Sequence, residues 1–154
     1  MSEHRVRFSL NGEPIERTVP AERLLVDLLR EDLRRTGTKD GCSVGVCGLC
    51  TVQVDGAPMS ACLLLATQID GAVVTTVEGL ATASGPTPLQ EAFIAEGGFQ
   101  CGICTSGQLM AAAALLRDRP GATPAEVSDW MMGNLCRCTG YYGIARAIAA
   151  AAER

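Results

Sequence analysis

The beginning of the chain alternates between apolar and polar residues, which is the pattern of β-strands with one buried face. Alternation over Val6–Leu10 is followed by Asn11 and Gly12, a pair of residues typical of a tight hairpin turn. The alternation resumes over Ile15–Val19. The pattern therefore predicts two antiparallel strands at the start of the chain.

The next segment predicts one helix and two further strands. Leu24–Leu33 places its leucines on one helical face, whereas Thr51–Val54 alternates as a strand does. Val73–Val77 is a β-branched run, which favours a strand. A glycine-rich loop over residues 37–50 lies between the helix and the third strand. We therefore expect residues 1–80 to form a small α+β domain.

Helical signals replace strand signals after residue 80. A Ser/Thr/Gly/Pro-rich stretch over residues 82–88 is the expected linker. Thr123 and Glu126 have the spacing of a capping box, which marks the start of one helix. Trp130, Met131 and Met132 are expected to fill the core. The expected helices cover residues 88–96, 108–117, 124–132 and 142–152, so residues 81–154 are predicted to form a four-helix bundle.

The composition of the 154 residues excludes several classes of protein. With 47% hydrophobic residues and a formal net charge of -4, the chain is neither disordered nor suited to nucleic acid. Residues 1–10 lack the apolar core of a secretory signal, and the longest apolar run, residues 109–116, is too short to cross a bilayer. We expect a cytoplasmic protein without membrane contact, in which cysteines stay reduced.

Eight cysteines fall into two groups of four, and each group has metal-ligand spacing. The first group, spaced C-x4-C-x2-C-x11-C, is Cys42, Cys47, Cys50 and Cys62. The second group, spaced C-x2-C-x31-C-x-C, is Cys101, Cys104, Cys136 and Cys138. The opening spacing of the first group is that of plant-type iron–sulfur proteins. Two four-thiolate centres predict a protein that carries electrons between two clusters.

The residues around the cysteines suit an anionic cluster. Gly41, Gly45 and Gly48 let the first loop curl and bring amide groups close to the sulfurs, and Gly102 does the same in the second set. Arg137 either places a cation beside the second set or forms a surface salt bridge. Amide N–H donors offset the charge of a cluster and tune its reduction potential.

Other interpretations of the cysteines remain open at this point. A structural zinc site accepts four cysteines at spacings similar to the first set. Four disulfides are a poor alternative, because Cys136 and Cys138 are too close in sequence to bridge separate elements easily. A free-standing ferredoxin that docks with many partners is a further alternative, although such a carrier needs only the first cysteine set.

Three blocks of sequence resemble one known family. These are G-C-x4-C-G-x-C-T-V over Gly41–Val52, Q-C-G-x-C-T-x-G over Gln100–Gly107, and G-N-L-C-R-C-T-G-Y over Gly133–Tyr141. In order and spacing the chain resembles the iron–sulfur small subunit of the molybdenum hydroxylases, the xanthine oxidase family. The resemblance covers nearly the whole chain. One departure is Ser106, where the family usually has proline.

The resemblance implies a fold and a cofactor set. The first cysteine set would hold a [2Fe–2S] cluster in a plant-ferredoxin-like β-grasp domain, and the second set would hold another in the helical domain. Gln100 and Cys138 match positions that contact the pterin of a molybdenum cofactor on a large partner subunit. The first cluster would pass electrons to a medium FAD-binding subunit or another acceptor.

The resemblance also implies a reaction and an assembly. The chain would be a subunit of a molybdenum-dependent oxidoreductase, with no catalytic residue of its own. The partner subunit would hydroxylate a carbon of an N-heterocycle or aldehyde with oxygen from water. A hetero-oligomer is expected, with a dimer of heterotrimers as one arrangement.

Overall fold

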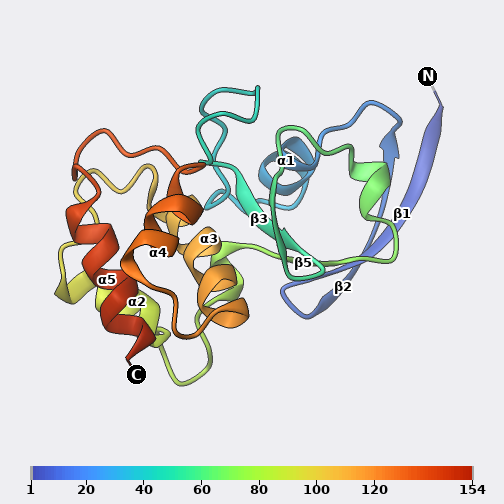
Figure 1. Cartoon of the computed structure of the whole chain (residues 1–154). Helices are drawn as coiled ribbons and strands as arrows, with labels where there is room; N and C mark the ends of the chain where they lie inside the picture. The colour runs from blue at the N-terminus through green and yellow to red at the C-terminus, as the bar shows by residue number, and fades with distance from the viewer. Residues whose placement is uncertain (1, 154) are drawn as a thin grey trace.

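The computed structural model describes residues 2–153, and it places a β-sheet half beside a helical half (Figure 1). The sheet has five strands in the order β2-β1-β5-β3-β4. The strands are β1 (Glu3–Leu10), β2 (Glu13–Pro20), β3 (Thr51–Val54), β4 (Ala57–Ser60) and β5 (Val73–Thr75). β1 and β5 pair in parallel and the other neighbours pair antiparallel, so the sheet is mixed.

The predicted hairpin is confirmed. β1 and β2 pair antiparallel from Glu3 opposite Pro20 to Leu10 opposite Glu13. The turn residues Asn11 and Gly12 have φ values of 52° and 86°. Glycine adopts such angles without a steric penalty, and asparagine tolerates them better than most residues. The inward residues Val6, Phe8 and Leu10 are buried, as the alternation predicts.

The helix predicted over Leu24–Leu33 is shorter and irregular. One α-helical turn, α1 (Leu25–Asp27), continues as a wider π-helical turn, η1 (Leu28–Asp32). The wider turn closes with a bond from the Leu33 amide to the Leu28 carbonyl at 3.0 Å. Together α1 and η1 still bury Leu25, Leu28 and Leu29 completely. The apolar spacing therefore gives the buried face correctly without defining the helix type.

Two details of the sheet differ from the prediction. The sequence pattern did not indicate β4, which pairs only with β3 and therefore lies at the edge, where Pro58 is tolerated. β5 ends at Thr75 instead of reaching Val77, because the Asn11 side chain takes the next backbone donor, the amide of Thr76, at 2.9 Å. A short helical turn, η2 (Ala66–Ile69), precedes β5, and a second one, η3 (Val77–Gly79), follows it.

The helical half contains α2 (Pro88–Ala95), α3 (Thr105–Asp118), α4 (Pro124–Met131) and α5 (Tyr142–Ala152). The capping box at α4 is confirmed: the Thr123 hydroxyl accepts from the Glu126 amide, and the Glu126 carboxylate accepts from the Thr123 amide at 2.9 Å. α3 begins three residues before the predicted Gln108. Gly107 lies inside this helix, and its lack of a side chain lets the Gly48 carbonyl come close.

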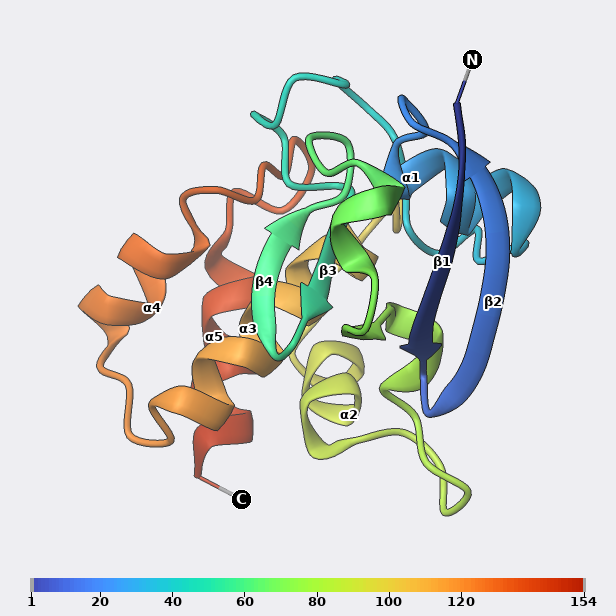
Figure 2. The same cartoon turned by 90° about the vertical axis from the view of Figure 1, so that its right-hand side faces the viewer.

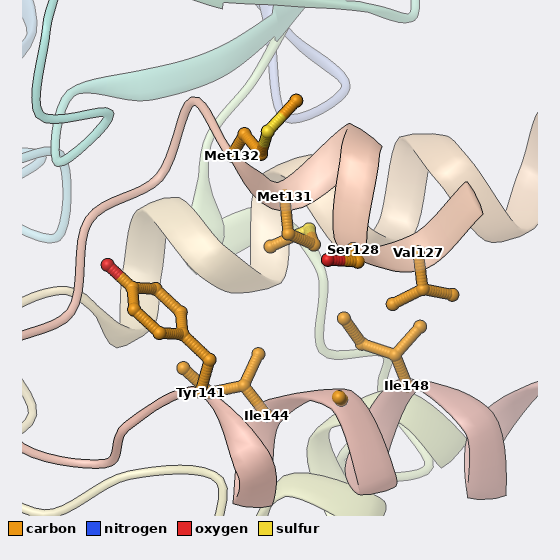
Figure 3. Close-up of a pocket in the computed structure, with 8 residues that line it drawn as sticks. Val127, Ser128, Met131, Met132, Tyr141, Ile144 and Ile148 are labelled. Carbon is orange, nitrogen blue, oxygen red and sulfur yellow. The ribbon is translucent and has the colours of Figure 1, made fainter. Parts of the chain in front are cut away.

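Each half has its own apolar core, and β3 and α3 join the halves (Figure 2). Across this junction the buried amide of Gln53 donates to the Met110 carbonyl at 2.9 Å. Met131 is buried in the helical core and Trp130 is partly buried, as expected. Met132 is 70% exposed, so its predicted place in the core is wrong. It follows the last α4 residue and points away from α5 (Figure 3).

Candidate metal centres

The first cysteine set comes together as two contacting pairs. The Cys47 amide donates to the Cys42 sulfur at 3.5 Å. Cys50 and Cys62 form the other pair: burial, and then the neighbouring Cys62 thiol, raise the pKa of Cys50. Cys50 and Cys62 are both buried in the apolar core of the sheet half, at 2% and 3% exposure. The loop after η1 thus supplies three thiols, and the turn after β4 supplies the fourth.

The glycines of this loop have separate roles. Gly45 and Gly48 have φ values of 75° and 70°, where residues with side chains are strained. Gly41 does not need such an angle, but a Cβ there would lie 2.8 Å from Leu49 and 3.5 Å from the Cys47 sulfur. A Cβ at Gly45 or Gly48 would also meet neighbouring atoms, so these two glycines are required by both conformation and space, and Gly41 by space alone.

Backbone donors and burial shift the pKa values of two cysteines of the first set in opposite directions. Amide N–H groups, first that of Val44, lower the pKa of Cys42 from its ordinary value to about 6. Burial raises the pKa of Cys50 to about 12. Cys42 is thus ready as a thiolate, whereas Cys50 becomes one only when a cation compensates its buried charge.

The second cysteine set also forms two contacting pairs. The sulfurs of Cys101 and Cys138 lie 3.5 Å apart. Burial, and then the neighbouring Cys136 thiol, raise the pKa of Cys104. Cys101 and Cys138 are exposed. Cys104 directly precedes α3, so the positive end of that helix faces this set. Each pair therefore takes one thiol from the loop between α2 and α3 and one from the loop between α4 and α5.

The surroundings of the second set are open. A cavity of ≈ 410 Å³ is lined by its four cysteines together with Arg137 and Tyr141. Arg137 is exposed and forms no salt bridge with the described residues, so the second of the two alternatives for it, a surface salt bridge, is not seen. Gly102 has a φ of 83°, and a Cβ there would meet no atom within 4 Å, so this glycine serves conformation alone. Gln100 is exposed beside Cys101.

Tyr141 was not predicted to have a role at either centre. Its hydroxyl oxygen accepts a hydrogen bond from the Cys136 amide at 3.0 Å. Its backbone has a φ of 69°, an unusual angle for an aromatic residue, immediately before α5. The only sequence signal was its place at the end of the third cysteine block. Its ring also borders an apolar groove of ≈ 340 Å³ between α4 and α5, with Ile144 and Ile148 (Figure 3).

A backbone hydrogen bond connects the two cysteine sets directly. The amide of Leu135 donates to the carbonyl of Cys47 at 2.9 Å. Cys47 belongs to the first set, and Leu135 is covalently joined to Cys136 of the second. Beside this bond, the buried side chain of Asn134 donates to the Gly48 carbonyl at 2.9 Å. No local pattern predicts these contacts, because they join segments more than 80 residues apart.

The donor sets fit two-iron clusters. Two thiolates on one tetrahedral metal at the usual sulfur distance lie about 3.7 Å apart. The sulfurs of Cys101 and Cys138 lie at 3.5 Å, which fits two ligands of one iron. Among residues 2–153, no three His, Cys, Asp or Glu side chains have the arrangement of a single-ion site. When bound, each [2Fe–2S] cluster accepts and releases one electron.

The fold and these centres define an iron–sulfur protein of α+β class with two cluster-binding regions. A family model described as "2Fe-2S iron-sulfur cluster binding domain" matches residues 8–80, and one described as "[2Fe-2S] binding domain" matches residues 76–149. The chain is 44% identical to the nicotinate dehydrogenase small FeS subunit of Eubacterium barkeri, over 100% of this chain and 98% of that protein. It is also 44% identical to the isoquinoline 1-oxidoreductase subunit alpha of Brevundimonas diminuta, covering 96% and 97% of the two chains.

Solved structures agree with this. Quinoline 2-oxidoreductase from Pseudomonas putida 86 matches with a TM-score of 0.94 and 45% identity, over 98% of this chain and 94% of that chain. Aldehyde oxidoreductase from Desulfovibrio gigas matches with a TM-score of 0.93 and 39% identity, over 97% of this chain and 17% of that one. The chain belongs to the iron–sulfur small subunits of the molybdenum hydroxylase family.

Membership confirms several expectations. The chain is an electron-transfer subunit of a multi-subunit oxidoreductase, it carries [2Fe–2S] clusters, and larger subunits are its partners. The family implies a molybdenum cofactor and FAD on those partners. No helix among residues 2–153 has both the length and the apolar character needed to cross a membrane.

Proposed function

We propose that Cys42, Cys47, Cys50 and Cys62 hold the first cluster and that Cys101, Cys104, Cys136 and Cys138 hold the second. The observation that carries this assignment is that the thiols converge at two places: the Cys47 amide donates to the Cys42 sulfur at 3.5 Å, and all four cysteines of the second set line one cavity, with the sulfurs of Cys101 and Cys138 3.5 Å apart. The two centres correspond to units 1–80 and 81–154, in keeping with the separate apolar core of each half.

The second centre faces the molybdenum subunit in this proposal. Cys101 and Cys138 are exposed, Gln100 next to them is exposed, and Arg137 is free of salt bridges within the described chain. Gln100 and Cys138 contact the pterin of the molybdenum cofactor, and Arg137 raises the reduction potential of the second cluster by its charge. The amide of Leu135, bound to the Cys47 carbonyl, connects the second centre to the first.

The first centre passes electrons onward to a medium FAD-binding subunit. Gly41, Gly45 and Gly48 let amide groups reach its sulfurs, and Gly102 does so at the second centre. Several relatives are named for N-heterocyclic compounds and one matched structure for an aldehyde, so the substrate is an N-heterocycle or aldehyde that the large subunit hydroxylates. The assembly is a hetero-oligomer, with a dimer of heterotrimers as its simplest symmetric form.

The cytoplasm is the compartment that this proposal assigns to the chain. All eight cysteines are free thiols in the structure. Cytosolic glutathione and thioredoxin keep thiols reduced, which leaves them available as ligands.

The test is cluster analysis of the chain purified with the subunits that bind it. We expect about four iron and four inorganic sulfide per chain, corresponding to two two-iron centres, and two distinct EPR signals after dithionite reduction. Co-purification of a large molybdenum-containing subunit distinguishes a dedicated subunit from a free-standing ferredoxin. Stoichiometric zinc without sulfide, or a colourless preparation after anaerobic reconstitution, would refute the cluster assignment.

A further inference from the structure

We propose that Asn134 is a positioning residue that fixes the separation and magnetic coupling of the two clusters, an inference that rests on the proposed function. Asn134 is 6% exposed and lies at the junction of the two halves. Its Nδ2 donates to the Gly48 carbonyl at 2.9 Å and to the Thr51 hydroxyl at 3.1 Å. Both hydrogens of its side-chain amide are therefore used across the junction.

The contacts of Asn134 reach the segments that carry the cysteines of the first set. Gly48 directly follows Cys47, and Thr51 directly follows Cys50. The Thr51 hydroxyl in turn donates to the Gly48 carbonyl at 2.7 Å, so the three residues form a closed network. A shift of this network would move the backbone beside two proposed ligands of the first cluster.

The same network reaches the second set. Asn134 is two residues before Cys136, and its carbonyl accepts from the buried Gln108 side chain at 2.6 Å. The backbone amide of Gln108 donates to the Cys104 carbonyl at 3.0 Å. The network therefore connects backbone beside four proposed ligands, two from each cluster.

Close packing leaves the network little freedom. A Cβ at Gly48 would lie 2.3 Å from the Gly133 carbonyl and 2.6 Å from Asn134 Nδ2. A Cβ at Gly107 would lie 2.1 Å from the Gly48 carbonyl. Both side-chain donors of Asn134 are used, whereas the buried Oε1 of Gln108 has no hydrogen-bond partner among the described residues. Loss of an Asn134 donor would leave a buried acceptor short of a bond. Asn134 is thus placed to hold the two loops at one distance.

Gln53 provides a matched control. It is also a buried amide, at 8% exposure, and its Nε2 also donates across the junction to a backbone carbonyl, that of Met110. Neither of those residues is adjacent to a cysteine. Gln53→Ala therefore removes a comparable bond between the halves without touching a cluster-bearing segment.

The experiment measures the magnetic interaction of the two reduced clusters by EPR in the full chain, purified with its partner subunits. When both clusters are reduced, each splits or relaxes the signal of the other by an amount that falls with their separation. We expect Asn134→Ala to weaken this interaction while both signals remain, Gln53→Ala to leave it at the wild-type value, and Thr51→Val to weaken it less than Asn134→Ala.

The outcomes separate this inference from the proposed function. If the wild-type chain shows two interacting signals and neither Asn134→Ala nor Thr51→Val changes their interaction, Asn134 has no positioning role and the cluster assignment still stands. An equal change in Gln53→Ala would also overturn the inference, because it would reflect general loosening of the junction. If Asn134→Ala does not assemble both clusters, Thr51→Val, which keeps the side-chain shape, decides the question. A wild-type chain without clusters would overturn both proposals.

Discussion

The two cysteine sets differ in their shielding, although each consists of two contacting pairs. In the first set Cys50 and Cys62 are part of the apolar core of the sheet half. In the second set none of the four is buried, and Cys101 and Cys138 are exposed. The first centre is thus partly covered by its own chain, whereas the second centre is open on the surface of the chain.

The difference also extends to how each set is supported. The first set lies on a loop that glycines bend, between η1 and β3. The second lies at helix termini: Cys104 directly precedes α3, and the Cys136 amide donates to the Tyr141 hydroxyl. An open centre is completed by something outside the chain, which agrees with the family's larger partner subunits. The comparison therefore predicts different sensitivities to substitution at the two centres.

The largest effect is expected from removal of one cysteine at each centre. Cys50→Ala and Cys138→Ala should each lower the iron content from about four to about two per chain and abolish one EPR signal. Cys50→Ala should also destabilise the chain by roughly 1–2 kcal/mol more than Cys138→Ala, because it removes a buried side-chain atom from the core. Iron analysis and urea denaturation measure both quantities. Equal losses of stability would contradict the difference in shielding.

The second largest effect concerns the glycines. Gly48→Ala imposes an unfavourable φ and brings a methyl group 2.3 Å from the Gly133 carbonyl, whereas Gly102→Ala imposes only the unfavourable φ. We expect Gly102→Ala to cost about 1 kcal/mol and Gly48→Ala about 2–4 kcal/mol in the free energy of unfolding. Gly12→Ala, with a φ of 86° and open space, is the control away from both centres. A Gly48→Ala variant as stable as Gly12→Ala would show that the junction yields easily.

A smaller effect is expected from Tyr141→Phe, which affects only the second centre. Without the hydroxyl, the Cys136 amide is free to donate to a sulfur, which favours the more negative, reduced cluster. A hydrogen bond of roughly 1 kcal/mol corresponds to a rise on the order of 40 mV for one electron. An EPR-monitored redox titration measures both potentials. Tyr142→Phe, at a neighbouring tyrosine that is 78% exposed, should change neither potential.

The smallest effect is expected from Ser106→Pro, which restores the residue usual in the family. Ser106 is the second residue of α3, and its buried hydroxyl has no hydrogen-bond partner among the described residues. Proline is accepted in the first turn of a helix, where the amide has no partner within the helix. We expect a stabilisation of about 0.4–1 kcal/mol with both clusters retained, measured by urea denaturation. A loss of the second EPR signal would show that Ser106 matters to the centre.

Local patterns predicted much of this fold. The hairpin at Asn11 and the capping box at Thr123 are confirmed, because each depends on residues close in sequence. The short edge strand β4 was missed because Pro58 argues against a strand except at an edge, and edge position is a property of the whole sheet. The helix over Leu24–Leu33 has the predicted buried face with a different helix geometry, because apolar spacing over two turns does not distinguish α from π.

The candidate sites divide in the same way. Spacing alone grouped the cysteines into two sets of four, and the structure brings each set together. The contacts of Asn134 and Tyr141 could not be predicted from spacing, because they depend on how the halves meet and on how the chain turns before α5. Gln108 did carry a signal, as a polar residue at the start of an alanine- and leucine-rich helix.

The parallel pairing of β1 with β5 has a consequence for the newly made protein. Ser9 and Leu10 pair with Val73 and Val74, so the centre of the sheet remains incomplete until Val73 and Val74 have left the ribosome. All four thiols of the first set precede them in the chain and leave the ribosome earlier. These four thiols are therefore present on the nascent chain before the sheet of the half that buries Cys50 and Cys62 can be completed.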